Sequence, residues 1–335
     1  MVQQAMRAAF PAAEARVATF YQMQEYHLGW RDLQLQPAES DPGKLIRPLL
    51  VLLSCAAAGG DTAQALPLAA GVQLLHDFTL IHDDIEDNSD TRRGRPTLWS
   101  VWGLAQGINA GDGMFVLAHL AIHRLADVGV PPARALAVLR RFDEVILQVC
   151  ESQYLDLSFE GQLAITPDDY LAMIGRKTAA LVAGACELGA MVAGAPESTV
   201  AALAEFGRRV GLAFQVEDDI LGIWGAPEIT GKPRAADLYR RKLSLPVVHA
   251  LAHAPGRSEL AELYEAGELD DAGVERALAI LDSSESREYC AAVAAEHHEA
   301  AFAALDSLPK AAKAEAEAAR ARLRSLAESL IGRQA

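Results

Sequence analysis

Two clusters of acidic residues have the types and spacing needed to bind a metal ion. In the first, GVQLLHDFTLIHDDIEDNSD, five acids fall within eight residues: Asp83, Asp84, Glu86, Asp87 and Asp90. Asp83 and Asp87 are four residues apart, so on a helix their carboxylates share one face and repel unless a cation bridges them. Hard cations such as Mg²⁺ take oxygen ligands and often complete their shell with substrate phosphates. An acidic helix end that faces solvent is the alternative.

The second cluster interrupts an apolar helical pattern in GLAFQVEDDILGIWG. Glu217, Asp218 and Asp219 are consecutive, and three consecutive residues of a helix cannot all face solvent. At least one carboxylate therefore points inward, where it needs a partner. Gln215 lies about one turn before the two aspartates, so its amide is one candidate partner.

Cationic residues occur close to both clusters in the sequence. The cations are Lys44, Arg47, Arg92, Arg93, Lys177, Lys232 and Lys242. A lysine that enters an apolar helix usually packs its stem and extends its head to solvent. Here, however, the cations accompany acids in a chain whose formal charge is −15. This arrangement favours a diphosphate site in which guanidinium and ammonium groups bind the anion while Mg²⁺ offsets the carboxylates.

The composition predicts that α-helices position these residues. The chain has 335 residues, of which 51% are hydrophobic and only 6% aromatic. This hydrophobic content excludes a disordered chain, and the acidic balance argues against a nucleic-acid-binding protein. The length would fit one large domain or two ordinary ones. Because no linker or shift of composition divides the chain, we expect a single all-α domain over 1–335.

Apolar residues recur at three- and four-residue spacing along most of the sequence, which is the helical period. The predicted helices span 2–28, 44–59, 64–87, 104–127, 131–159, 167–174, 177–195, 197–224, 235–253, 268–282, 285–306 and 310–331. Alternating strand patterns are absent. Thr166 and Asp169 predict a capped helix start at Pro167. The helices over 177–195 and 244–252 are apolar nearly all round, which is typical of the centre of a large bundle.

The remaining features predict a cytoplasmic protein. Cys55, Cys150, Cys186 and Cys290 lie far apart in apolar segments, which predicts four reduced thiols in the core rather than a zinc site. The N-terminal segment is not a signal peptide, because charged residues interrupt it before an apolar stretch forms. No apolar stretch is long enough and free enough of charge to span a membrane.

Five segments occur in an order that matches the motifs of a known family. They are GKLIRP (GKRxRP in the family), HDDIED followed by RRG (DDxxD with RRG), KTAAL (KT), FQVEDDILG (FQxxDDxxD) and GKPRAADLYRRKLSLP (GKxxGxDxxxxKxTLP). The sequence therefore resembles the trans-isoprenyl diphosphate synthases of the polyprenyl synthetase family over nearly its whole length. The resemblance implies an all-α bundle around a central cavity, with the two aspartate-rich helices facing each other across it.

The resemblance also implies a role for each matching residue. The Mg²⁺ ligands would be Asp83, Asp87 and Asp218, supported by Asp84 and Asp219. The allylic diphosphate would be bound by Arg92, Lys177, Lys232 and Lys242. The isopentenyl diphosphate would be bound by Lys44, Arg47, His76 and Arg93. Thr178 and Gln215 would place oxygen atoms near the developing carbocation, and Gln153 and Asp156 would support the site from behind.

The implied reaction is ionisation, condensation and elimination. Mg²⁺, three ions per site with substrate bound, would stabilise the leaving diphosphate of the allylic substrate, and isopentenyl diphosphate would then attack the cation. We further expect a homodimer, with no nucleic-acid partner and no stable membrane insertion. Two alternatives stay open: a class I terpene cyclase of the same fold, and a non-catalytic subunit of a heteromeric synthase. The residues of the isopentenyl diphosphate pocket argue against the cyclase.

One position departs from the family pattern. Gly222 stands where the second motif usually ends in aspartate, and this is the only feature that favours the non-catalytic subunit. Without that carboxylate, the metal bound by Asp218 would lose an outer ligand. An aspartate restored at 222 should therefore tighten Mg²⁺ binding or leave activity unchanged, unless the glycine serves close helix packing.

The product length is partly predictable from the residues before the first motif. Phe78 and Thr79 lie five and four residues before Asp83, so on a helix they point away from the metal site along the growing tail. An aromatic residue, a small residue and no insertion in the motif resemble short-chain synthases, of C15 to C20. Geranylgeranyl diphosphate is the best match. Met114, Phe115 and Leu117 are the alternative floor of the tail pocket.

Overall fold

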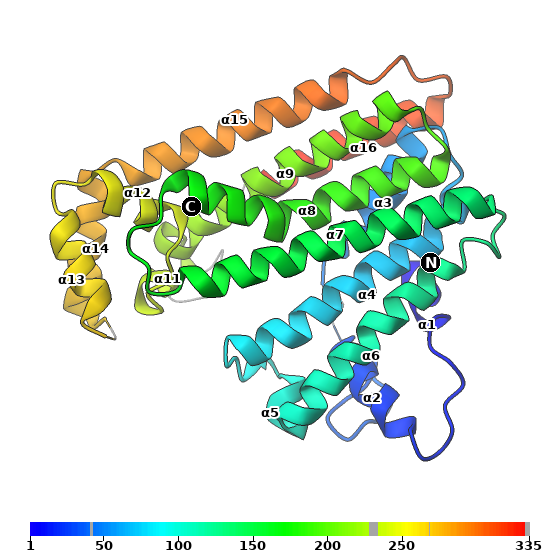
Figure 1. Ribbon diagram of the computed structural model, residues 1–335, viewed down its shortest axis with the longest axis horizontal. Coiled ribbons are helices and arrows are strands. Elements are labelled where there is room, and N and C mark those ends of the chain that lie inside the picture. Colours follow the sequence, from blue (N-terminus) through cyan, green and yellow to red (C-terminus); the bar gives the residue numbers. More distant parts are fainter. Residues whose placement is uncertain (41–42, 228–233, 268, 332–335) are drawn as a thin grey trace. The chain divides into compact units, whose positions relative to one another are not determined.

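The computed structural model of the chain describes residues 1–40, 43–227, 234–267 and 269–331 (Figure 1). Its internal contacts divide it into two compact units. The first unit comprises Met1–Arg140 and Leu188–Ala195, and the second comprises Arg141–Glu187 and Pro196–Ala335. This division does not show whether the two units fold as one domain. The single domain over 1–335 therefore stays a prediction.

The first unit is built around helix α4. Its elements are α1 (Val2–Arg7), α2 (Ala18–His27), α3 (Ile46–Ala57), α4 (Thr62–Glu86), β1 (Thr91–Arg92), β2 (Arg95–Pro96), α5 (Leu98–Trp102), α6 (Leu104–His123) and the start of α7 (Pro132–Phe159). Helix α4 packs against α1, α3 and α6. Gly71 permits a close approach to α6, because a Cβ at that position would lie 2.4 Å from Cγ1 of Ile122. The close contact fixes α4, which carries the first acidic cluster at its C-terminal end.

The second unit is built around helix α9, which carries the second acidic cluster. Besides most of α7, its elements are α8 (Pro167–Ala193, to Glu187 in this unit), α9 (Glu197–Trp224), α11 (Ala236–Tyr239), α12 (Leu245–His253), α13 (Arg257–Glu265), α14 (Asp271–Ser283), α15 (Ser286–Asp306) and α16 (Ala314–Ile331). Gly207 and Gly211 bring α9 within van der Waals distance of the α8 backbone. Helix α15 packs along α9.

The all-α fold is confirmed, and most of the predicted helices are found. The start of α8 is capped as expected: Asp169 N donates to Thr166 Oγ1 over 3.1 Å, while Thr166 N donates to Asp169 Oδ2 over 3.0 Å. Helix α9 has the predicted bounds. Segments 167–174 and 177–195 are one continuous helix, because Gly175 does not interrupt it.

Five details of the sequence prediction are wrong. The helix predicted over 2–28 is broken between Arg7 and Ala18, where Pro11 cannot donate an N–H. Segment 235–253 is broken into α11 and α12. A short hairpin, β1–β2, is present although no strand was predicted, and α5 and α13 were missed. Of the four cysteines, which are all free, Cys150 is exposed rather than in the core.

In the described part of the chain, no helix combines the length and the apolar character that crossing a membrane requires.

Candidate active site

The first acidic cluster lies at the C-terminal end of α4, in the first unit. Asp87 is the C-cap residue, and Asn88 ends the helix with a positive φ of 49°. The two consecutive aspartates differ in exposure: Asp83 is half-buried, whereas Asp84 is only 2% exposed. Burial raises the pKa of Asp84, and Arg92, whose Nε donates to Asp84 Oδ1 over 2.7 Å, partly offsets this. Asp83 and the exposed Asp87 therefore present carboxylates outward, while Asp84 fixes the neighbouring arginine.

A two-residue turn positions the arginines that follow. In the β1–β2 hairpin, Thr91 pairs with Pro96 and Arg92 with Arg95. The turn residues Arg93 and Gly94 both have positive φ, 52° and 72°, as a tight right-twisted hairpin requires. The hairpin thus places three guanidinium groups, those of Arg92, Arg93 and Arg95, close together in the sequence but pointing in different directions.

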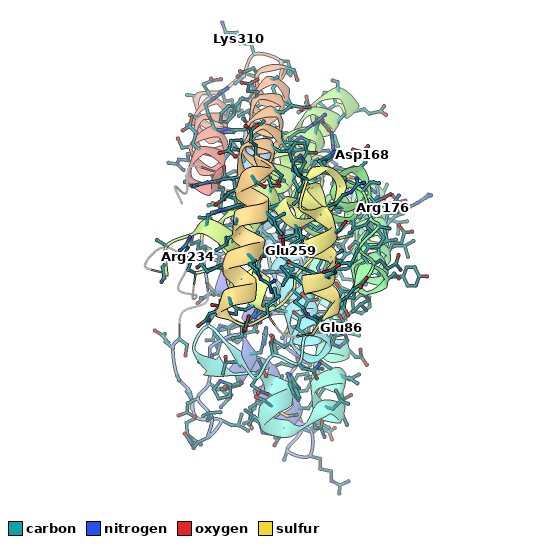
Figure 2. All side chains as sticks on the ribbon, turned by 90° about the vertical axis from the view of Figure 1, so that its left-hand side faces the viewer. Glu86, Asp168, Arg176, Arg234, Glu259 and Lys310 are labelled. Atoms are coloured by element: carbon teal, nitrogen blue, oxygen red, sulfur yellow. The ribbon has the colours of Figure 1, made fainter. Side chains whose placement is uncertain are left out.

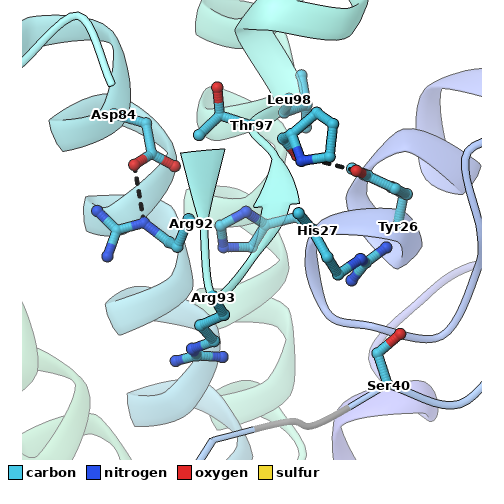
Figure 3. A pocket seen from close by; sticks show the side chains of 10 residues that line it. Tyr26, His27, Ser40, Asp84, Arg92, Arg93, Thr97 and Leu98 are labelled. Atoms are coloured by element: carbon cyan, nitrogen blue, oxygen red, sulfur yellow. Dashed lines mark hydrogen bonds and ion pairs between the residues drawn. The ribbon is translucent and has the colours of Figure 1, made fainter. Parts of the chain in front are cut away.

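A pocket of about 170 Å³ lies beside this hairpin (Figure 3). Its lining residues are Tyr26, His27, Ser40, Asp84, Arg92, Arg93, Arg95, Pro96, Thr97 and Leu98. One wall is fixed by Tyr26, whose hydroxyl donates to the Pro96 carbonyl over 2.9 Å. Three arginines and a single buried carboxylate line this pocket, so it has the charge to bind an anion. His27 and Tyr26 were not predicted from the sequence.

Two of the residues predicted to bind isopentenyl diphosphate contact each other. Nη1 of Arg47 donates to Nε2 of His76 over 3.2 Å. Burial lowers the pKa of Arg47 to about 10, with Asp77 partly offsetting the effect. Burial, together with Arg47, Arg93, Arg92 and His27, lowers the pKa of His76 well below its usual value. His76 is therefore neutral, accepts from Arg47 through Nε2, and keeps Nδ1–H for another acceptor.

Lys44 and Arg93 complete the same predicted set. A Cβ on Gly43 would lie 2.8 Å from Nη2 of Arg93, so the glycine before Lys44 makes room for this guanidinium. Lys44 is exposed. The structure thus brings Arg47 together with His76, and Arg93 together with the segment that carries Lys44.

Phe78, one of the two predicted chain-length residues, belongs to an aromatic row between α4 and α6. The ring of Phe78 lies 4.8 Å from that of His82 and 5.3 Å from that of Phe115, and Phe115 lies 4.6 Å from His119. Thr79 donates its hydroxyl to the His76 carbonyl over 2.8 Å. Of the alternative floor residues, Met114 and Leu117 are buried in the core, whereas Phe115 packs directly on Phe78.

In the second unit, Asp218 and Asp219 also differ in exposure. Asp218 is exposed and Asp219 is fully buried. The buried carboxylate accepts hydrogen bonds from four groups: the Tyr170 hydroxyl at 2.5 Å, Gln215 Nε2 at 3.2 Å, Lys242 Nζ at 3.3 Å and the Leu245 backbone N–H at 3.3 Å. Asp219 is therefore the inward carboxylate that the sequence predicted, and it anchors α9 to α8 and α12.

The two residues predicted near the carbocation, Thr178 and Gln215, are linked to Asp219 by consecutive hydrogen bonds. Thr178 donates its hydroxyl to Gln215 Oε1 over 2.7 Å, and the amide of Gln215 donates to Asp219. Lys177 forms an ion pair with Asp156. The preceding residue, Arg176, extends from the surface of α8 (Figure 2) and pairs with Glu151 at 2.7 Å.

Lys242 lies among carboxylates. Its Nζ is 3.3 Å from Asp219 and 3.7 Å from Asp237, and its side chain is 46% exposed. Desolvation lowers the pKa of Lys242, but Asp219, Asp237 and Asp218 more than offset this, so its pKa is raised. Asp237 and Tyr170 were missed as members of this cluster. Lys232, by contrast, lies outside the described residues.

The donor chemistry of the predicted metal ligands fits Mg²⁺. Asp83, Asp87 and Asp218 all offer carboxylate oxygens that reach the surface of their own unit. Within the described residues no group of three or more His, Cys, Asp or Glu side chains forms a ready-made metal cage. Mg²⁺ does not require one, because one or two carboxylates with waters and substrate phosphates usually suffice.

Comparison with known proteins identifies the family of this chain. The family model described as "Polyprenyl synthetase" matches residues 34–281. A geranylgeranyl diphosphate synthase of Mycobacterium tuberculosis is 45% identical over 285 residues, which cover 84% of this chain and 80% of that protein. A short chain isoprenyl diphosphate synthase of Methanothermobacter thermautotrophicus is 40% identical over 255 residues, covering 76% and 77%.

Solved structures point to the same family. A polyprenyl synthetase from Streptomyces coelicolor A3(2) superposes with a TM-score of 0.89 at 34% sequence identity, covering 98% of this chain and 96% of that one. The matching motifs, the helical fold and the extent of these similarities lead to one conclusion: this chain belongs to the polyprenyl synthetase family.

Proposed function

We propose that this chain is a short-chain trans-prenyltransferase that condenses isopentenyl diphosphate with an allylic diphosphate. The observation that carries the proposal is the cationic region of the first unit. There a half-buried Arg47–His76 pair and the arginine hairpin lie in the same unit as the carboxylates at the end of α4. Relatives named geranylgeranyl and short chain isoprenyl diphosphate synthases support it.

The cationic side chains bind and orient the two diphosphates. Arg47, Arg93 and Lys44 bind isopentenyl diphosphate, and His76 donates its Nδ1–H to a diphosphate oxygen. Arg92 and Lys177 bind the allylic diphosphate, together with Lys232 and Lys242. Two anions placed next to each other repel in water, so their pre-positioning is a large part of the catalytic effect.

Mg²⁺ is the expected cofactor, since the family is Mg²⁺-dependent, and we propose three ions per site with substrate bound. Asp83, Asp87 and Asp218 would hold it, and it would supply Lewis-acid stabilisation of the leaving diphosphate. Thr178 and Gln215 face the developing allylic cation: the Thr178 hydroxyl donates to Gln215, so its lone pairs stay available as a negative dipole. The proton lost in the last step passes to the departed diphosphate.

The decisive experiment is incubation of the purified chain with isopentenyl diphosphate, Mg²⁺ and each allylic diphosphate in turn. We expect release of inorganic diphosphate and a prenyl diphosphate lengthened by C5 units. A hydrocarbon product from the allylic substrate alone would indicate a terpene cyclase instead. No turnover by the isolated chain, with turnover on adding another subunit, would indicate a non-catalytic partner. The names of the relatives do not favour either alternative.

For the product we propose geranylgeranyl diphosphate, with Phe78 limiting its length and Phe115 supporting that ring from α6. Phe78→Ala opens a volume on the order of 100 Å³ that an apolar tail can enter, so longer products are expected. A matched control is Phe302→Ala, which removes another half-buried ring that also packs on a histidine, 4.4 Å away. An unchanged product distribution in Phe78→Ala would reject Phe78 as the length determinant.

We also propose a homodimer, in which a second copy covers the exposed apolar residues of α6. These are Leu104, Ile108, Val116 and Leu120. Charged substitution at the centre of this row, Val116→Glu, should convert a dimer to a monomer in light scattering. A wild-type chain that elutes as a monomer would contradict the proposal. The cytoplasmic location stays a prediction of the sequence.

A further inference from the structure

The glycine that departs from the family motif faces an aspartate from another helix. A Cβ built on Gly222 would lie 2.2 Å from Oδ2 and 2.6 Å from Cγ of Asp237. Non-bonded atoms do not approach so closely, so a side chain at 222 and the present position of Asp237 exclude each other. The carboxylate of α11 thus fills the notch that the missing side chain leaves on α9.

Asp237 cannot easily leave this position. Its side chain is only 9% exposed, and the backbone carbonyl of the same residue accepts from Lys242 N over 2.9 Å. Its carboxylate raises the pKa of the buried Tyr264, although burial is the larger cause. A substituent at 222 would therefore have to move either the carboxylate or the turn that carries it.

The position of Asp237 matters because of Lys242. The ammonium group lies between two buried carboxylates, Asp219 at 3.3 Å and Asp237 at 3.7 Å. Asp219 comes from α9 and Asp237 from α11, so carboxylates from two helices hold the lysine. A carboxylate at 222 would emerge from α9 into the space that Asp237 now occupies.

We propose that Asp237 supplies from α11 the carboxylate that the second acidic motif lacks at position 222, and that it is a positioning residue for Lys242. Gly222 and Asp237 then depend on each other, because the Asp237 carboxylate occupies the space that the glycine leaves free. The role of Lys242 in binding the allylic diphosphate rests on the proposed function, whereas the packing of the pair does not.

The packing is tested by a double-mutant cycle on the protein without substrate. Gly222→Ala should lower the midpoint of thermal unfolding by at least about 3 °C, because its Cβ displaces the carboxylate. The same change made in Asp237→Ala should be neutral or stabilising, since the notch is then empty and alanine favours a helix over glycine. Gly175→Ala is the matched control, because there a Cβ would meet only Leu212 Cδ2 at 3.8 Å. If Gly222→Ala changed the unfolding midpoint equally in the wild type and in Asp237→Ala, the proposed pair would be wrong.

The positioning role is tested by moving the carboxylate. Asp237→Ala should raise KM for the allylic diphosphate on the order of tenfold, the equivalent of one charge-assisted contact, with a smaller effect on kcat. Contrary to the first expectation from the sequence, Gly222→Asp alone should impair both stability and KM, because two carboxylates then compete for one space. Gly222→Asp with Asp237→Ala returns one carboxylate to that space and should recover most of the loss in KM. No recovery beyond that of Asp237→Ala would overturn the positioning role.

The two sets of measurements separate this inference from the proposed function. If the chain makes no prenyl diphosphate but the unfolding midpoints show coupling between positions 222 and 237, the proposed pair stands and the proposed prenyltransferase function is wrong. If the chain is active but the effects of the two substitutions on the unfolding midpoint are additive, only the proposed pair is wrong.

Discussion

Arg47 in the first unit and Lys242 in the second are cations near acidic clusters, but their pKa values are shifted in opposite directions. Arg47 contacts a neutral histidine and has its pKa lowered to about 10 by burial, with only partial compensation from Asp77. Lys242 lies between two carboxylates, and its pKa is raised in spite of desolvation. The first region has an excess of positive charge, whereas the second has already neutralised its lysine.

The difference indicates how each region receives an anion. A diphosphate in the first region adds negative charge beside Arg47, whose burial Asp77 offsets only in part, so binding relieves an electrostatic cost of folding. In the second region a diphosphate must compete with Asp219 and Asp237 for the same ammonium group. A bare diphosphate should therefore bind the first region more readily, and the second should depend more strongly on a divalent cation.

The acidic clusters differ in a parallel way. In each, one of two consecutive aspartates is buried and held, and the other is more exposed. Among the described residues, the buried Asp84 carboxylate accepts from one arginine, whereas the buried Asp219 carboxylate accepts from four donors. Because successive helical residues are about 100° apart, such a division is what two adjacent carboxylates on one helix must adopt. The outward members are suited to bind metal and the buried members to anchor the helix.

The largest expected effect comes from removing an outward carboxylate. Asp83→Ala and Asp218→Ala should each lower kcat by on the order of 10³-fold, because a Lewis-acid contact is worth several kcal/mol. The free energy of unfolding should change little, since Asp83→Ala also relieves repulsion with Asp87. Turnover measured at saturating Mg²⁺ checks this, and activity near the wild-type level would remove these residues from the metal site.

Next in size is the loss of an inward carboxylate. Asp219→Asn should lower the free energy of unfolding by about 3 kcal/mol, because it leaves Lys242 without its closer buried partner and weakens a four-donor network. Asp84→Asn, with a single arginine, should cost less, about 1 kcal/mol. Urea unfolding of both, with Asp218→Asn as an exposed control, measures the contrast. Equal losses at 84 and 219 would contradict the difference in anchoring.

Substitution of Arg47 and of Lys242 tests the two substrate assignments. Arg47→Ala should raise KM for isopentenyl diphosphate roughly 10- to 100-fold, as expected for a charge-assisted contact of about 1.5–3 kcal/mol. Lys242→Ala should act on the allylic KM instead. Steady-state kinetics with each substrate varied in turn give both values. If Arg47→Ala raised the allylic KM, the two substrate assignments would be exchanged.

The smallest expected effect is a pH dependence from His76. Its pKa is lower in the folded than in the unfolded chain, so acidification protonates the unfolded chain first. The contribution of His76 to stability is therefore present above its ordinary pKa of about 6.5 and is lost as the pH falls toward the folded value, with a limiting slope of about 1.4 kcal/mol per pH unit. The free energy of unfolding should fall less steeply between pH 7 and 5 in His76→Gln than in the wild type. Parallel curves would show that His76 has no lowered pKa.

Sequence patterns predict those parts of this molecule that depend on local spacing. Gln215 and Asp219 are four residues apart on one helix, and their contact follows from that spacing. The bounds of α9 follow from Pro196 before it and the glycine after it. The Thr166–Asp169 cap is equally local.

Contacts across long separations in the sequence could not be predicted in this way. Tyr170 is 49 residues from Asp219, and nothing in the sequence around it distinguishes it from an ordinary core tyrosine. Asp237 belongs to a recognised motif, but its place in the notch at Gly222 depends on how α11 docks on α9. The hairpin has strands of two residues each, too short to produce an alternating pattern. Tertiary packing, rather than periodicity, determines these features.

The left-handed turn at Arg93 has a consequence for engineering. Arginine at a φ of 52° is less favourable than glycine or asparagine, because its Cβ crowds the backbone. Directed evolution toward heat tolerance alone would therefore be expected to enrich Arg93→Gly or Arg93→Asn, each gaining roughly 1 kcal/mol of stability while discarding a guanidinium from the pocket. Any thermostabilised library of this chain should be selected for turnover in the same round.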